Sequence, residues 1–352
     1  MMPVILSDNK TFARQYNGIA YLRFWFKIWR GYRAAEKRLK KTLRDKICYY
    51  GPFKGEFGHM TAHTAPFLMY LHRQGVKIIY CGMEIHKPLL VDDNGQSIIH
   101  DFRPLRDFFA EVSPRTNNTV PPADVAEEIQ EFVEEAEASG KAFWNIGDSF
   151  YYWFIHRNWL LRNHMFTYDL RKAYGTKEEN SVCLFPRSKG SKVAKNNGAP
   201  WNYQEVIECI RPYFDKVYIC GHPSQSESLS VSGNVELYVS TDNRIMLEKC
   251  ANAKLIITQH SGVNNIGVYT NTKVLIIYNG GARIDDIGSI YNTLRFRPAI
   301  GESYPLSFAF TPAEISDFAR RFKQNGYKTP DDWKNTAGTL EEATRMENGG
   351  GR

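Results

Sequence analysis

The glycine-rich loop 51–58, which follows the apolar run at residues 47–50, places a carboxylate between two glycines. The sequence around this carboxylate is Gly55-Glu56-Phe57-Gly58-His59. Glycines let a backbone approach a ligand closely, and a carboxylate there can take a proton from a hydroxyl group. We therefore predict Glu56 as the general base and His59 as the alternative catalytic group, with Gly55, Phe57, Gly58 and His63 around the same site. A tight turn with a solvated glutamate is the structural alternative.

A basic turn, residues 186–192, follows the apolar run at residues 182–185. The guanidinium of Arg187 can hold a phosphate through two N–H groups, and Lys189 and Lys192 add point charges. Ligands of α/β sheets bind beyond the carboxyl ends of the strands, so we predict an anion site here. An exposed basic loop without a ligand is the alternative.

A third candidate turn, residues 258–265, joins an apolar run to the start of a helix. The free N–H groups and positive dipole end of such a helix suit a diphosphate. The predicted donor-site residues are His260, Ser261, Gly262, Asn264 and Asn265. Helix capping by Ser261 and the two asparagines is the alternative.

His222 follows the apolar run at residues 216–220 and is a fourth candidate. It could contact a nucleotide base or a phosphate. A purely structural histidine is the alternative.

These turns need a scaffold that brings strand ends together. Apolar runs predict strands at residues 47–50, 76–81, 182–185, 216–220, 235–239, 254–258 and 273–278. Amphipathic stretches predict helices at residues 19–44, 59–73, 124–138, 202–214, 243–251 and 312–324. The alternation predicts parallel sheets. We also predict that the aromatic segment 143–174 is helical and largely buried. The expected fold class is α/β, with two Rossmann-like domains facing a central crevice.

The expected domain boundaries follow from the same pattern. Residues 1–45 form a basic aromatic helical segment, and residues 46–175 form the first Rossmann-like domain. The second Rossmann-like domain covers residues 176–310. A return helix at residues 311–328 and a flexible tail at residues 329–352 complete the chain.

The positive charge of the chain is concentrated in one segment. The 352 residues contain 45 Lys and Arg against 38 Asp and Glu, a net charge of +7. Residues 23–46 hold ten basic and two acidic residues, a net charge of +8, so the remainder is nearly neutral. A nucleic-acid partner is therefore disfavoured for the body of the protein. The predicted helix 19–44 carries an apolar, mainly aromatic stripe of Leu22, Trp25, Phe26 and Trp29. It either contacts an anionic membrane surface or packs on the domain behind it.

The rest of the composition indicates a globular protein in the cytoplasm. No apolar run reaches the roughly 18–20 residues that cross a bilayer, and no signal-peptide pattern is present. The six cysteines are scattered, without a zinc-binding spacing, which is typical of a reducing compartment. We expect a cytoplasmic protein, with peripheral membrane contact as the open alternative.

Residues 181–280 resemble the donor half of GT-B glycosyltransferases, with a weaker similarity to the family 61 type. There, a basic strand end and a motif of the form strand–H-G-A-G-x-x-N recur. Here the motif stands at residues 255–265, with Ser261 in place of a glycine and one residue of altered spacing. The turn at residues 55–58 is similar in position to the acceptor-side loop of heptosyltransferase-like enzymes, which carries an acidic base. The predicted helix 312–324 fits the GT-B habit of crossing back onto the first domain.

The resemblance implies a hexosyl- or pentosyltransferase. Such an enzyme moves a sugar from a nucleotide-diphosphate sugar to a hydroxyl of a glycan acceptor. No D-x-D triplet occurs in the sequence, so we expect no metal and no cofactor. Two other functions stay open. One is a sugar-nucleotide epimerase or another nucleotide-binding enzyme on the same scaffold, and the other is a non-catalytic protein that binds membrane or nucleic acid through residues 23–46.

Overall fold

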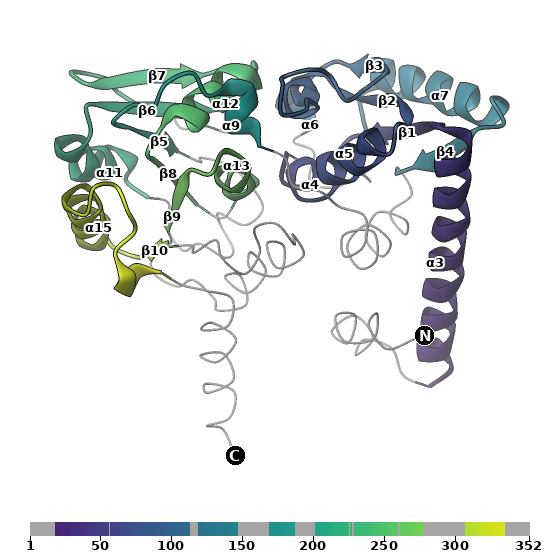
Figure 1. Ribbon diagram of the computed structural model, residues 1–352, viewed down its shortest axis with the longest axis horizontal. Coiled ribbons are helices and arrows are strands. Elements are labelled where there is room, and N and C mark those ends of the chain that lie inside the picture. Colours follow the sequence, from purple (N-terminus) through teal and green to yellow (C-terminus); the bar gives the residue numbers. More distant parts are fainter. Residues whose placement is uncertain are drawn as a thin grey trace. The chain divides into compact units, whose positions relative to one another are not determined.

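The computed structural model describes most of the chain in two compact units. The described residues are 18–55, 57–112, 119–146, 169–186, 201–224, 226, 229–259, 261–277 and 307–334. The first unit comprises residues 1–90 and 97–166, and the second comprises residues 91–96 and 167–352. Each unit has one parallel β-sheet with helices packed on it, which confirms the α/β class and the two Rossmann-like units (Figure 1).

The sheet of the first unit has the strand order β3-β2-β1-β4. Its strands are β1 (Ile47–Phe53), β2 (Lys77–Met83), β3 (Asp101–Leu105) and β4 (Ala142–Asn145). The helical elements are α4 (Phe57–His59), the π-helix η1 (Met60–Thr64), α5 (Ala65–Arg73), the 3-10 helix η2 (Glu84–Leu89), α6 (Phe109–Val112) and α7 (Ala123–Ala138). This order is the first part of the Rossmann order.

Alternating side chains of β1 and β2 build the two faces of this sheet. Tyr49 and Ile79 join a buried cluster with Phe132 of α7. The next residue of β1, Tyr50, points to the other face, where its ring lies 6.0 Å from that of Phe67 of α5. Successive side chains of a strand point to opposite faces, so the continuous apolar runs reflect a sheet that is covered on both sides.

Two strands of the first unit differ from the prediction. β3 was not predicted because this edge strand contains exposed Arg103 and Pro104, and proline is tolerated at a sheet edge. β4 occupies the start of the segment 143–174 that was predicted as helical. Its alternating burial is a strand pattern, but four residues are too few to reveal it within an aromatic stretch. Residues 147–168 lie outside the described part of the chain.

The helix α3 (Ile19–Asp45) confirms the predicted helix 19–44. The second half of α3 packs on β1 and β4 and buries Ala35, Leu39 and Thr42. The prediction of a separate segment at residues 1–45 is therefore wrong for this half, because its side chains belong to the first unit. No described helix has the length and apolarity needed to cross a membrane.

The sheet of the second unit has the order β10-β9-β8-β5-β6-β7. Its strands are β5 (Ser181–Phe185), β6 (Lys216–Gly221), β7 (Val235–Val239), β8 (Leu255–Thr258), β9 (Lys273–Ile277) and β10 (Ser307–Ala309). The helices are α9 (Leu170–Tyr174), α11 (Tyr203–Ile210), the 3-10 helix η4 (Arg211–Tyr213), α12 (Asn243–Asn252), α13 (Val263–Thr270) and α15 (Pro312–Gln324). Counted from β5, this is the complete six-stranded Rossmann order, whose direction reverses between β5 and β8.

The boundary between the units lies earlier than the predicted position after residue 175. α9 contacts α12 and α13, so it belongs to the second unit. The short segment 91–96 joins it there, because the Asp93 carboxylate accepts the backbone N–H of Asp169 at 3.0 Å.

The predicted return helix is part of the core of the second unit. α15 packs on α11, and its buried side chains Ile315, Phe318, Ala319 and Phe322 lie in the cluster that also holds the strands of the sheet. The amphipathic pattern predicted the helix correctly, but the helix uses its apolar face within its own unit.

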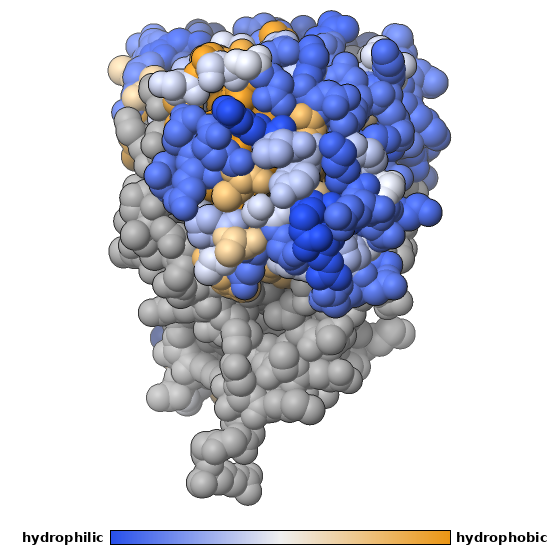
Figure 2. All heavy atoms as spheres, turned by 90° about the vertical axis from the view of Figure 1, so that its left-hand side faces the viewer, coloured by the Kyte–Doolittle hydropathy of each residue, from blue (hydrophilic) through white to orange (hydrophobic). Residues whose placement is uncertain are grey.

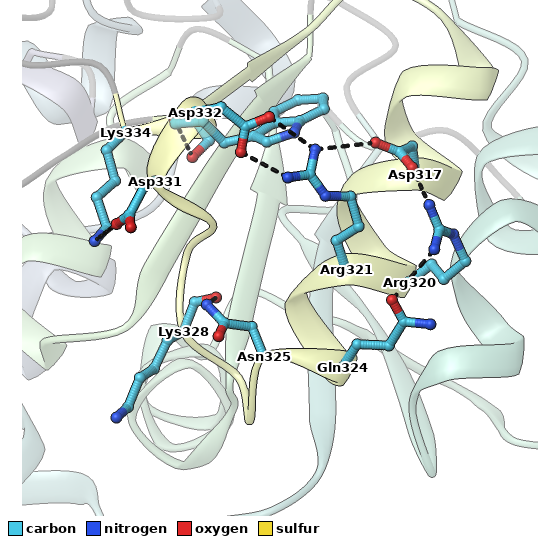
Figure 3. A network of polar contacts seen from close by, with 11 residues as sticks. Asp317, Arg320, Arg321, Gln324, Asn325, Lys328, Asp331, Asp332 and Lys334 are labelled. Atoms are coloured by element: carbon cyan, nitrogen blue, oxygen red, sulfur yellow. Dashed lines mark hydrogen bonds and ion pairs between the residues drawn. The ribbon is translucent and has the colours of Figure 1, made fainter.

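Residues 329–334 are ordered against α15 rather than forming part of a flexible tail. They include the short 3-10 helix η5 (Asp331–Trp333). The Trp333 ring meets the Phe318 ring edge-on, with the ring centroids 5.1 Å apart. The Arg321 guanidinium holds both carboxylate oxygens of Asp332, at 2.8 and 2.7 Å (Figure 3). A polar composition predicted a free tail, but one tryptophan and one ion pair anchor its first residues. The remainder, residues 335–352, lies outside the described part.

Candidate functional site

The glycine-rich turn of the first unit begins where β1 ends. Gly55 is buried, Phe57 and Gly58 are half-buried, and Glu56 lies outside the described residues. The Thr61 hydroxyl donates to the carbonyl oxygens of Phe57 (3.1 Å) and Gly58 (3.2 Å). These bonds run back along one helical stretch, from η1 to α4, and stabilise its first turn.

The structure brings His59 and His63 together on that helix. Their ring centroids are 6.0 Å apart, and both residues are half-buried. The predicted helix 59–73 starts earlier, with α4 at Phe57, and continues in the π-helical turn η1, which widens the backbone between the two histidines. π-Helical turns are frequent at functional sites. The two imidazoles are therefore placed next to the turn that carries Glu56.

His86 is a third histidine at this turn, and the sequence analysis missed it. β1 pairs with β2 so that Phe53 lies opposite Gly82, which brings η2 beside the glycine-rich turn. The fully buried ring of His86 meets the Phe53 ring edge-on at 5.3 Å and lies 6.4 Å from the Phe57 ring. Neither ring nitrogen has a hydrogen-bond partner in the described part of the chain. A single histidine after a strand gives no sequence signal for such a position.

Burial shifts the pKa values of two groups beside the turn. Burial lowers the pKa of His86 to about 3, so its imidazole is neutral at pH 7. Burial also lowers the pKa of the Lys54 ammonium, which directly precedes Gly55. Both shifts have the same cause, because a low-dielectric environment disfavours the protonated, charged form of each group.

Three predicted turns of the second unit depart from neighbouring strand ends. Phe185 of β5 pairs with Thr258 of β8, and Leu184 pairs with Ile219 of β6. The ends of β8, β5 and β6 therefore lie side by side at the carboxyl edge of the sheet. The reversal of strand order between β5 and β8 is the position at which open α/β sheets bind ligands. Arg187, Lys189, Lys192 and His260 lie outside the described residues.

Ser261 contacts the start of α13 but is not its N-cap, which is Gly262 and has no side-chain cap. The Ser261 hydroxyl accepts the backbone N–H of Val263 at 3.3 Å and lies 3.1 Å from the Thr258 hydroxyl. The N–H groups of Asn264 and Asn265 bond to the carbonyl oxygens of Ser261 and Gly262 at 3.2 and 3.1 Å. The prediction that these N–H groups are free is wrong, because the first turn of α13 closes on itself. Both asparagines lie inside the helix and do not cap it.

Gln259 is the residue of this edge that the sequence analysis overlooked. It directly follows β8 and is fully buried, and neither its amide oxygen nor its amide nitrogen has a partner among the described residues. The side-chain oxygen of buried Asn264 is also without a partner there. A buried amide without hydrogen bonds costs about 1–3 kcal/mol. A ligand that offers both donors and acceptors would satisfy these groups.

The His222 side chain forms hydrogen bonds within its own turn, at the end of β6. Its Nδ1 accepts the backbone N–H of Ser224 at 3.2 Å and lies 2.8 Å from the Ser224 hydroxyl. This favours the structural role for Nδ1. Across the described ranges, no three or more His, Cys, Asp or Glu side chains are grouped as a metal site would need.

Comparisons with known proteins found no match by sequence, but several solved structures are similar to this chain in part. No family model and no curated protein matches the chain. Among the similar solved structures are the Escherichia coli heptosyltransferase WaaC with ADP-2-deoxy-2-fluoro heptose and the E. coli ADP-heptose lps heptosyltransferase II. A family 9 glycosyl transferase from Veillonella parvula DSM 2008 is a third. WaaC is 10% identical at a TM-score of 0.43, with 67% of this chain and 90% of WaaC covered.

The other two structures have similar sequence identities and TM-scores. Heptosyltransferase II is 11% identical at a TM-score of 0.43 and covers 80% of this chain and 98% of its own. The V. parvula structure is 14% identical at a TM-score of 0.42 and covers 85% of this chain and 96% of its own. These descriptions name heptosyltransferases and family 9, not family 61.

Proposed function

We propose that this protein is a metal-independent glycosyltransferase of the GT-B type. It transfers a hexosyl or pentosyl group from a nucleotide-diphosphate sugar to a hydroxyl of a glycan acceptor. The observation that carries the proposal is Gln259, a buried amide without partners among the described residues, at the end of β8 where the Rossmann strand order reverses.

The second unit supplies the donor site in this proposal. Arg187, Lys189 and Lys192 follow β5 and neutralise the diphosphate as it leaves. Stabilising the charge that develops on a leaving group is usually the largest electrostatic contribution to catalysis. Gln259 and Asn264 offer amide donors and acceptors to the nucleoside or the sugar. His222 and His260 are further contacts at the same sheet edge.

The first unit supplies the acceptor site. The Glu56 carboxylate takes the proton of the acceptor hydroxyl while that oxygen bonds to the anomeric carbon and the bond from this carbon to the diphosphate breaks. His59 is the alternative base, and His63 and neutral His86 line the same turn. The buried His86 imidazole is uncharged, which supports a neutral ligand such as a sugar beside it.

We also propose that the protein is located in the cytoplasm. All six cysteines are free, and all but Cys209 are buried. Free thiols of this kind are typical of a reducing compartment.

A thermal-shift series tests donor binding. The full chain is heated with nucleoside diphosphates and their sugars, and a donor that binds only the native state raises the melting temperature. We expect one nucleotide to raise it for the wild type and for Gln324→Ala, a control on the exposed surface of the same unit. Gln259→Ala should lose most of that shift. Equal shifts in both variants would remove Gln259 from the donor site.

A further inference from the structure

The first half of α3 exposes a continuous apolar stripe. The exposed fractions are 70% for Ile19, 67% for Leu22, 58% for Phe26 and 46% for Trp29. These residues are spaced three, four and three positions apart, so they lie on one face of the helix. The Phe26 and Trp29 rings stack on one another, with their centroids 5.8 Å apart.

This stripe lies opposite the face by which α3 packs on the sheet. Ala35, Leu39 and Thr42 are buried against the first unit. At about 100° per residue, their directions around the helix axis differ from those of the stripe by roughly half a turn. Figure 1 shows this half of α3 running on beyond β1 and β4. The stripe is therefore not an extension of the packed face.

The charges on this half of the helix all have one sign. Arg23, Lys27, Arg30 and Arg33 are exposed, and no acidic residue occurs between residues 18 and 35. The Arg30 guanidinium lies 5.9 Å from the centroid of the Phe26 ring. Cations thus flank the aromatic stripe on the surface of the helix.

Within the described ranges, the other exposed apolar side chains do not form such a stripe. In the second unit they include Val231, Leu237 and Phe310. The face shown in Figure 2 is mainly hydrophilic, with small separate apolar spots among the described residues. Single exposed apolar residues are ordinary, whereas a contiguous row marks an interaction surface.

We infer that the first half of α3 docks on the surface of an anionic lipid bilayer. The aromatic and aliphatic side chains would enter the boundary between headgroups and acyl chains, and the basic side chains would pair with anionic headgroups. A second copy of the chain is a poorer partner, because pairing two such helices would bring like charges together. A nucleic acid would neutralise the basic residues but leave the apolar stripe in water. This surface uses none of the residues assigned to sugar transfer.

Vesicle cosedimentation tests the inference on the full chain. One set of vesicles contains equal parts of phosphatidylcholine and phosphatidylglycerol, and the other contains phosphatidylcholine alone. We expect binding to the anionic vesicles that is at least about tenfold tighter and weakens with added salt. The triple variant Leu22→Ser/Phe26→Ser/Trp29→Ser should bind about tenfold more weakly or worse.

Two further variants separate the contribution of the basic residues from that of the apolar stripe. Arg23→Gln/Arg30→Gln keeps the stripe and should lose about fivefold for each arginine removed. Val231→Ser/Leu237→Ser removes exposed apolar side chains from the second unit and should bind like the wild type. Circular dichroism checks that each variant is folded.

Three results would overturn the inference. One is unchanged binding of the triple variant, and another is equal, salt-insensitive binding to both kinds of vesicle. The third is a dimer by light scattering that only the stripe variant dissociates, which would assign the stripe to a second copy of the chain.

Discussion

The indole N–H of Trp144 donates a buried hydrogen bond of 3.0 Å to the hydroxyl of Thr42. Thr42 lies on α3 and Trp144 lies on β4, which pairs directly with β1, the strand that ends at the glycine-rich turn. The basic helix is thus fixed to the sheet that carries the proposed acceptor site. A contact of α3 with a membrane would therefore hold the first unit at that surface.

Thr42→Val tests this link. Valine keeps the shape but leaves the buried indole N–H without an acceptor, so we expect the free energy of unfolding in urea to fall by about 1–3 kcal/mol. Thr241→Val is the control, because Thr241 is exposed, and it should stay within about 0.5 kcal/mol of the wild type. Equal stability of the two variants would mean that the hydrogen bond contributes nothing to folding.

Gly51 positions the last part of β1. A Cβ atom at this residue would lie 2.5 Å from the carbonyl oxygen of Cys81 on the neighbouring strand. We expect Gly51→Ala to destabilise the protein by roughly 3 kcal/mol or more, because two strands must move apart.

Gly140→Ala is the matched control for Gly51. The φ angle of Gly140 is positive, like that of Gly51, and measures 64°. No atom lies within 4 Å of a Cβ atom added at Gly140. The substitution should cost only about 1–2 kcal/mol, the backbone penalty alone. Thermal unfolding of both variants measures the difference, and equal melting temperatures would contradict a steric role.

Buried His86 makes stability depend on pH. Its folded-state pKa is about 3, below its ordinary value near 6.5, so the unfolded chain binds a proton that the folded chain refuses. The free energy of unfolding should therefore fall as the pH drops from about 6.5 towards 3, by up to about 1.4 kcal/mol per pH unit from this group.

His86→Phe should remove that part of the slope. The new ring would lie among Phe53, Phe57 and Phe109, which already surround the imidazole. Urea titrations at several pH values compare it with wild type and with His100→Gln, a control at an exposed histidine. An unchanged slope in His86→Phe would show that the imidazole is not held neutral.

Arg187→Ala tests the basic turn. If the guanidinium holds the diphosphate, calorimetric affinity for the donor nucleotide should fall about tenfold or more, since hydrogen bonds to charged groups contribute about 1.5–3 kcal/mol. Arg211→Ala, an exposed arginine of the same unit, should bind like the wild type. Unchanged affinity of Arg187→Ala would remove this residue from the donor site.

Periodic apolar runs were sufficient to predict most strands and helices. Residues 182–185 and 217–220 are buried on both faces of their sheet, and their runs contain no breaker. β10, which begins at Ser307, has only three residues, too few for any period to show. The turns at strand ends were predictable for the same reason, because the carboxyl ends of parallel strands share one edge.

What the sequence could not reveal depends on contacts between distant residues. α3 has apolar side chains on two faces, and only the structure shows that Ala35 and Leu39 pack while Phe26 and Trp29 stay exposed. The burial of Gln259 and His86 could not be predicted either. Whether a polar side chain is buried without hydrogen-bond partners depends on which distant residues surround it in the fold. Glu56 stays a prediction from its place between two glycines.

Product analysis with a labelled sugar distinguishes a glycosyltransferase from an epimerase and from a protein without catalytic activity. The full chain is incubated with nucleotide-diphosphate sugars labelled in the sugar, with and without glycan acceptors, and the label is located by mass spectrometry. We predict that the label moves to the acceptor, and that Glu56→Gln slows this transfer by about 10²–10⁴-fold while Glu127→Gln, an exposed control on α7, does not. Label that remains on the nucleotide as an isomerised sugar would contradict a transferase, and full activity in Glu56→Gln would contradict the assigned base.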